Sequence, residues 1–259
     1  MSDRLDLNIP TNVRLTGKSG AGLCTGGVFA FALNGRKFIL TAVDAFRGEE
    51  DADVFLPATR TNIGQVTNLS KPNKKIAPFW HAIAVVALHD HLIPIVDQES
   101  RAHYPVVGAH CEHLIGQKVV KLGSPNIAGT AYTTCGSVGL VNPIDRSEAI
   151  YNEVIEVRLD KAAQLRRGDA GALVVTMLRQ AVGVSIAAKG NRLFVAPLQP
   201  LLEKLRLSLQ PPMSMSLAGC FPNPITALNQ IDRLALRAEP SLNLGKRPRR
   251  PSNRVRRAS

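Results

Sequence analysis

The four cysteines, whose thiols could bind a metal or attack a carbonyl, are widely scattered along the 259 residues. The densest group of possible metal ligands is His110-Cys111-Glu112-His113, which places three kinds of metal ligand within four positions. The chain has four cysteines, and no two of them show the C-x-x-C spacing typical of zinc sites. We therefore interpret residues 110–113 as a linker and expect no metal and no cofactor. A metal site at these residues is the alternative.

Three short segments bear most directly on function. Residues 39–44 read I-L-T-A-V-D, residues 82–88 read A-I-A-V-V-A-L, and residues 168–174 read G-D-A-G-A-L-V. They resemble the three catalytic segments of the bacterial-type trypsin-like (chymotrypsin-fold) serine proteases, which read roughly I-L-T-A-A-H, D-I-A-V-x-x-L and G-D-S-G-x-x-L-V. Their order and spacing along the chain agree with that family.

The resemblance covers residues 11–209. Residues 22–42 are similar to the hairpin that delivers the general base. Residues 129–138, which end in T-C-G-S-V, are similar to a second-barrel strand that often reads T-x-G-x-V. It implies one domain over residues 1–209, with lobes at about 11–107 and 108–196 and a closing helix at 197–207.

The same resemblance implies a substituted residue at every triad position: Asp44 for the general base His, Ala82 for the orienting Asp, and Ala170 for the nucleophilic Ser. A hydroxyl attacks a carbonyl only when a base takes its proton and a third group orients that base. The methyl group of Ala170 cannot attack, and aspartate, with an ordinary pKa near 4, is too weak a base at neutral pH. The implied oxyanion-hole donors are the backbone N–H groups of Gly168 and Ala170. They do not depend on the lost side chains, so a carbonyl or carboxylate could still bind there.

An active peptidase with an unrecognised triad is the competing interpretation. His81 directly precedes Ala82, so a shift of one position in the alignment would bring an imidazole to the site. We interpret His81 instead as a surface or interlobe histidine. Cys135 is not expected to be a nucleophile, because it falls in an expected strand rather than in a Gly-Asp-Cys-Gly turn.

The hydrophobic pattern predicts β structure in both halves of the chain. Short apolar or alternating runs separated by turn residues occur at 26–33, 36–42, 53–56, 82–88, 118–123, 136–141, 154–159, 173–177 and 181–186. Asn34-Gly35 is a strong hairpin-turn signal between the first two runs. Together with the resemblance, this pattern predicts an all-β fold of two six-stranded antiparallel β-barrels, followed by C-terminal helices and a disordered basic tail.

Two helices are expected after the strands. The closing helix has leucines at helical spacing between residues 198 and 205. A second helix at residues 224–238 lies within a linker region at 210–244, with Asn223 as its cap and Pro224 in its first turn. Its apolar stripe is expected to dock on the barrels; contact with a partner is the alternative.

The net charge of +12 is concentrated at the C-terminus. Residues 245–259 hold seven cations and no acid, and residues 1–244 carry only +5. The seven cations are Lys246, Arg247, Arg249, Arg250, Arg254, Arg256 and Arg257. Arginine predominates and no aromatic residue is present, so this tail favours sequence-neutral contact with phosphates of nucleic acid or another polyanion. A solvated or targeting tail is the alternative.

Composition excludes several classes of protein. No apolar run approaches the roughly 18 residues of a membrane span, and the N-terminus shows no signal-peptide pattern, so we expect a soluble, cytoplasmic protein without membrane contact. Cysteines stand at Cys24, Cys111, Cys135 and Cys220. In that compartment they are expected to be reduced thiols.

These observations predict a protein of protease shape that is not an enzyme. We expect a catalytically inactive trypsin-like binding or scaffold module that holds a protein or peptide partner in the cleft between the barrels. Its basic tail would add contact with nucleic acid. The alternatives are an active serine-type peptidase with an unrecognised triad and a nucleic-acid-binding subunit of a larger assembly.

Overall fold

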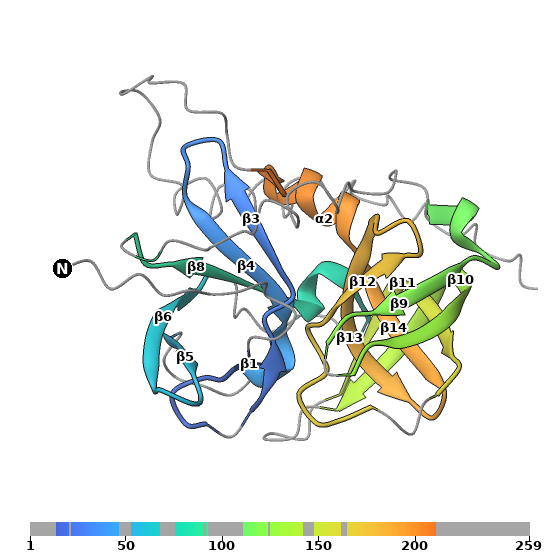
Figure 1. Ribbon diagram of the computed structural model, residues 1–259, viewed down its shortest axis with the longest axis horizontal. Helices are drawn as coiled ribbons and strands as arrows, with labels where there is room; N and C mark the ends of the chain where they lie inside the picture. Colours follow the sequence, from blue (N-terminus) through green and yellow to red (C-terminus); the bar gives the residue numbers. More distant parts are fainter. Residues whose placement is uncertain are drawn as a thin grey trace, which may run out of the picture. The chain divides into compact units, whose positions relative to one another are not determined.

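The computed structural model describes residues 14–20, 22–46, 53–67, 76–90, 92, 111–123, 125–141, 148–161 and 165–210. These residues form mostly β structure (Figure 1). The strands are β1 (Arg14–Leu15), β2 (Cys24–Thr25), β3 (Val28–Ala32), β4 (Lys37–Ala42), β5 (Asp53–Leu56), β6 (Thr61–Val66), β7 (Ile76–Pro78), β8 (Ile83–Leu88), β9 (Lys118–Lys121), β10 (Ile127–Val141), β11 (Glu148–Leu159), β12 (Leu173–Thr176), β13 (Ala181–Lys189), β14 (Arg192–Pro197) and β15 (Leu207–Ser208). The helical elements are α2 (Leu198–Leu205) and the 3-10 turns η2 (Val43–Ala45), η3 (Phe79–Ala82) and η4 (Cys111–Leu114).

The first sheet is antiparallel and has the strand order β15-β3-β4-β8-β6-β5. Its β3–β4 hairpin turns at Asn34-Gly35, as the sequence predicts, and Gly35 takes the left-handed conformation (φ +80°) that such a turn requires. The sixth strand, β15, comes from beyond α2. A short β1–β2 pair joins the edge of this sheet through a bridge between Thr16 and Phe55.

The second sheet closes on itself. Its order is β10-β9-β12-β13-β14-β11, and a further antiparallel pairing between β10 and β11 completes a six-stranded barrel, green to orange in Figure 1. The short strand β7 comes from the first half of the chain and adds in parallel to β11. Each sheet therefore receives one strand from a distant part of the chain.

The core explains why several strands are apolar throughout. In β4, Phe38 and Leu40 belong to a cluster that also contains Tyr151 and Phe194 of the second sheet. The intervening Ile39 belongs to a separate cluster whose buried members all fall between Leu15 and Leu92. A strand buried on both faces reads as a continuous hydrophobic run rather than an alternating one.

Helix α2 and the short strand β15 are the last elements of the described part of the chain. The helix covers Leu198–Leu205, slightly shorter than the predicted 197–207, because Arg206 adopts a left-handed conformation (φ +53°) and the chain then enters β15. Leu198, Leu201 and Leu202 are its buried residues. No helix among the described residues is long and apolar enough to cross a membrane. The helix expected at 224–238 and the tail at 245–259 lie outside the described residues.

Candidate functional site

The Gly-Asp-Ala-Gly loop at residues 168–171 is bonded to β2 of the short β1–β2 pair and to β13 of the second sheet. On one side, the N–H of Thr25 in β2 donates to the Ala170 carbonyl (2.7 Å), and the Thr25 hydroxyl donates to the Gly168 carbonyl (2.7 Å). On the other side, the N–H of Gly171 donates to the Ser185 carbonyl in β13 (2.6 Å). The loop backbone is thus fixed from two directions.

The structure brings the three motif segments together. Gly171 packs so closely on β4 that a Cβ added to it would lie 2.2 Å from the Thr41 hydroxyl oxygen and 3.2 Å from the Ala42 nitrogen. The chain then continues from Ala42 directly into η2, which contains Asp44, and η2 contacts η3, which ends at Ala82. The backbone segments that carry Asp44, Ala82 and Ala170 are therefore neighbours.

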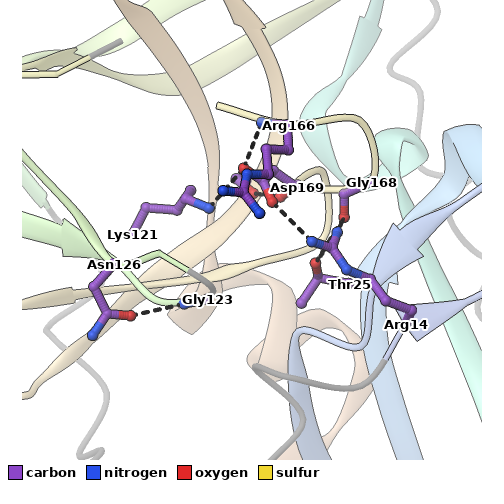
Figure 2. Close-up of polar contacts among 9 residues, drawn as sticks. Arg14, Thr25, Lys121, Gly123, Asn126, Arg166, Gly168 and Asp169 are labelled. Atoms are coloured by element: carbon purple, nitrogen blue, oxygen red, sulfur yellow. Dashed lines mark hydrogen bonds and ion pairs between the residues drawn. The ribbon is translucent and has the colours of Figure 1, made fainter. Parts of the chain in front are cut away.

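Asp169 is held inside the loop by three groups (Figure 2). Its Oδ2 accepts the N–H of Arg166 (2.9 Å) and forms an ion pair with the Lys121 ammonium (3.0 Å). Its Oδ1 forms an ion pair with Arg14 (3.2 Å). The Lys121 side chain is fully buried and that of Asp169 is 7% exposed, so this pair is shielded from solvent. The carboxylate is committed to holding the loop.

Arg14 also fixes the neighbouring peptide group. Its Nη1 donates to the Gly168 carbonyl, which the Thr25 hydroxyl contacts as well. On the same loop, neither the N–H of Gly168 nor that of Ala170 has a hydrogen-bond acceptor among the described residues. A carbonyl or carboxylate oxygen is the chemical group that would satisfy two such donors.

Solved structures that are similar to this one include three proteases. A chymotrypsin from Cellulomonas bogoriensis is 21% identical, covers 80% of this chain and 100% of its own, and gives a TM-score of 0.54. Protease A from Thermobifida fusca is 18% identical, covers 77% and 96%, and gives 0.53. A Nocardiopsis protease is 18% identical, covers 78% and 98%, and also gives 0.53. No family model and no curated protein matches the sequence. The fold is that of the trypsin-like serine proteases.

A pocket of about 190 Å³ opens beside the loop of this trypsin-like fold. Most of its lining is apolar or backbone, and Arg166 adds a cation at its wall. The lining consists of Leu165, Arg166, Gly168, Asp169, Ala170, Ser185, Ala187, Ala188 and Leu193. Because Asp169 is already paired, the pocket suits an aliphatic side chain rather than a cationic one.

The other candidate residues that the structure describes lie in η3, β10 and η4. His81 lies within η3, is half-buried and stacks obliquely near Trp80 (ring centroids 6.2 Å apart). Cys135 is exposed on β10, and His113 is exposed in η4. Within the described ranges no three His, Cys, Asp or Glu side chains gather as a metal site. His110 and the seven tail cations fall outside those ranges.

The sequence analysis did not identify the residues that hold the loop in place, Arg14, Thr25 and Lys121. Lys121 ends β9, which reads K-V-V-K, and it carries the only signal: it falls two residues after the buried Val119, so it lies on the same, buried face of the strand. A buried lysine needs an acidic partner, but the sequence does not show which acid that is. Arg14 and Thr25 gave no signal, because they approach the loop only through the pairing of β1 with β2.

Proposed function

We propose that this protein is a catalytically inactive trypsin-like protein that acts as a binding or scaffold module for a protein or peptide partner. The observation that carries the proposal is Ala170. It stands at the third position of a Gly-Asp-x-Gly loop whose backbone is fixed by Thr25, and whose acid, Asp169, is fixed by Lys121. The backbone of the loop is held in position, but the side chain at position 170 is only a methyl group.

The chemistry of acyl transfer supports inactivity. Loss of the nucleophile or the base of a triad lowers the rate by about 10⁶-fold, equivalent to about 8 kcal/mol of transition-state stabilisation. Asp44 and Ala82 replace the remaining two triad groups in the proposed alignment. What remains is electrostatic binding of an oxygen atom by the N–H groups of Gly168 and Ala170.

Binding does not need the lost side chains. An extended peptide segment would place a carbonyl, or a terminal carboxylate, against the two N–H donors and insert an aliphatic side chain into the pocket of about 190 Å³. The partner would thus be held in the manner of a protease ligand without being cleaved.

Incubation of the protein with casein and with a peptide library is expected to release no fragments, because no hydroxyl or thiol stands at position 170. Mass spectrometry of the mixtures checks this. Cleavage that disappears in His81→Ala but persists in the matched variant His113→Ala would contradict the proposal. That outcome would show that an active triad uses His81.

The tail adds a second contact in this proposal. Replacing its seven cations by glutamine, with the chain length kept, is expected to weaken binding to single-stranded DNA by about 10³-fold at 0.1 M salt. It should also reduce the magnitude of the log–log salt slope by about 5, at about 0.7 per phosphate contact. Fluorescence anisotropy between 50 and 300 mM salt checks this. Unchanged affinity and slope would show that the tail serves only solubility or targeting.

A further inference from the structure

Cationic residues occupy four of five positions in one row across the second barrel. The row is defined by direct cross-strand pairing of neighbouring strands β9, β10, β11, β14 and β13. Its members are Lys118, Thr130, Arg158, Arg192 and Lys189, in that order. The four cations are all exposed. We call these five residues the basic row.

The basic row lies on the outer surface of the barrel. Residues directly opposite each other in antiparallel strands point to the same side of the sheet. The next residues along three of the strands, Val119, Leu159 and Leu193, are buried in the barrel interior. Four interstrand steps of about 4.8 Å give the row a length of about 19 Å.

Acidic side chains pair with only two of the four cations of the basic row. Lys118 forms an exposed ion pair with Asp160 (3.0 Å), and Arg192 forms a bidentate pair with Glu156 (2.5 and 2.7 Å). The hydrogen bond to Glu156 is the main cause that raises the pKa of Arg192, which stays charged. In the described part of the chain, no acid pairs with the remaining two cations of the row.

An exposed aromatic ring stands beside one of these unpaired cations, Arg158. Tyr132 on β10 is 51% exposed, and the Arg158 guanidinium carbon lies 3.6 Å from its ring centroid. The contact orients Arg158 and leaves part of the phenol ring open to solvent. An exposed aromatic ring next to a line of cations is the combination by which proteins bind the bases and phosphates of single strands.

We propose that the basic row binds single-stranded nucleic acid, with phosphates on Arg158 and Lys189 and a base stacked on Tyr132. A duplex fits less well, because its bases are already stacked on one another and cannot reach the ring. An acidic protein segment would use the cations but not the ring. The site uses neither the loop at Gly168 and Ala170 nor the tail, so it stands independently of the proposed scaffold function.

The test uses the full chain with the seven tail cations replaced by glutamine, so that the tail cannot hide a weaker site. In this background Lys118, Arg158 and Lys189 are replaced by glutamine together. Arg192 is kept because it pairs with the buried Glu156. The matched control replaces Arg60, Arg179 and Lys204, which removes the same charge at two turns and at α2. Anisotropy with labelled (dT)20 and (rU)20 reports affinity, and a thermal melt reports folding.

The row variant is expected to bind both oligonucleotides at least tenfold more weakly than the control. Its salt slope is expected to be smaller in magnitude by about 1.4, at about 0.7 for each of the two phosphate contacts. Tyr132→Leu is expected to weaken binding at least fivefold with an unchanged slope, since stacking carries no charge. Equal affinities of the row variant and its control, both folded, would overturn the site. Competition by polyglutamate as strong as by (dT)20, with no effect of Tyr132→Leu, would overturn nucleic acid as its ligand.

Discussion

Asp169→Asn is expected to lower the free energy of unfolding by about 3–5 kcal/mol, because it leaves the buried Lys121 ammonium without a counter-charge. The Lys121 side chain is fully buried, and its nitrogen lies 3.0 Å from Asp169 Oδ2. Arg14, with a side chain that is 30% exposed, regains water when the carboxylate is lost, whereas Lys121 does not. Urea denaturation of the full chain measures the change.

Two further variants distinguish the effect of an unpaired buried charge on stability from the effect of a general disruption of the loop. Asp169→Asn combined with Lys121→Met is expected to recover most of the lost stability, since the stranded charge is gone and methionine fills the same space. Asp160→Asn, which breaks the exposed pair with Lys118, is expected to cost at most about 1 kcal/mol. Equal losses from Asp169→Asn and Asp160→Asn would contradict the role assigned to the buried pair.

Gly171→Ala is expected to cost at least about 4 kcal/mol, because no space exists for a methyl group. A Cβ at this position would lie 2.2 Å from both the Thr25 carbonyl oxygen and the Thr41 hydroxyl oxygen, and Gly171 has φ +91°. The methyl group would push the loop away from β2 and β4. It would also break the bond from the Gly171 N–H to Ser185 (2.6 Å).

Gly35→Ala is the matched control for this substitution. Gly35 also has a positive φ (+80°), but nothing lies within 4 Å of an added Cβ. The Gly35→Ala substitution is therefore expected to lower the free energy of unfolding only by the conformational penalty of a positive φ, about 1–2 kcal/mol. Thermal and urea denaturation of both variants measure the difference. If the two losses were equal, the close packing of the loop against β4 would be wrong.

Local patterns in the sequence predict several regular strands, among them β3, β4, β5 and β8, but they miss the six-residue strands β6 and β14. The strand predicted at residues 53–56 is β5 with the same bounds, and the turn at Asn34-Gly35 is confirmed. The runs predicted at 136–141 and 154–159 are the C-terminal parts of the longer strands β10 and β11. The hydrophobic runs miss residues 127–135 of β10, which include Gly129, and residues 148–153 of β11, where polar and apolar residues are mixed.

Long-range pairings could not be predicted from such patterns. The three residues of β7 and the two of β15 are too short to carry a period of their own. Their pairing with β11 and β3 depends on the whole tertiary structure. The same holds for the site: the motif at 168–171 is visible in the sequence, but Arg14 and Lys121 reach Asp169 only after the β1–β2 pair and the second sheet have formed.

Labelling with a serine-directed fluorophosphonate probe tests the central claim most directly. The unmodified chain is expected to remain unlabelled, and so is Ala170→Ser alone, because a hydroxyl without a base is not activated. The triple variant D44H/A82D/A170S, if folded by its thermal melt, is expected to be labelled at position 170, since the three segments adjoin. Labelling of the unmodified chain that one substitution abolishes would contradict the claim that it is inactive. A folded triple variant that stays unlabelled would contradict the convergence of the three positions.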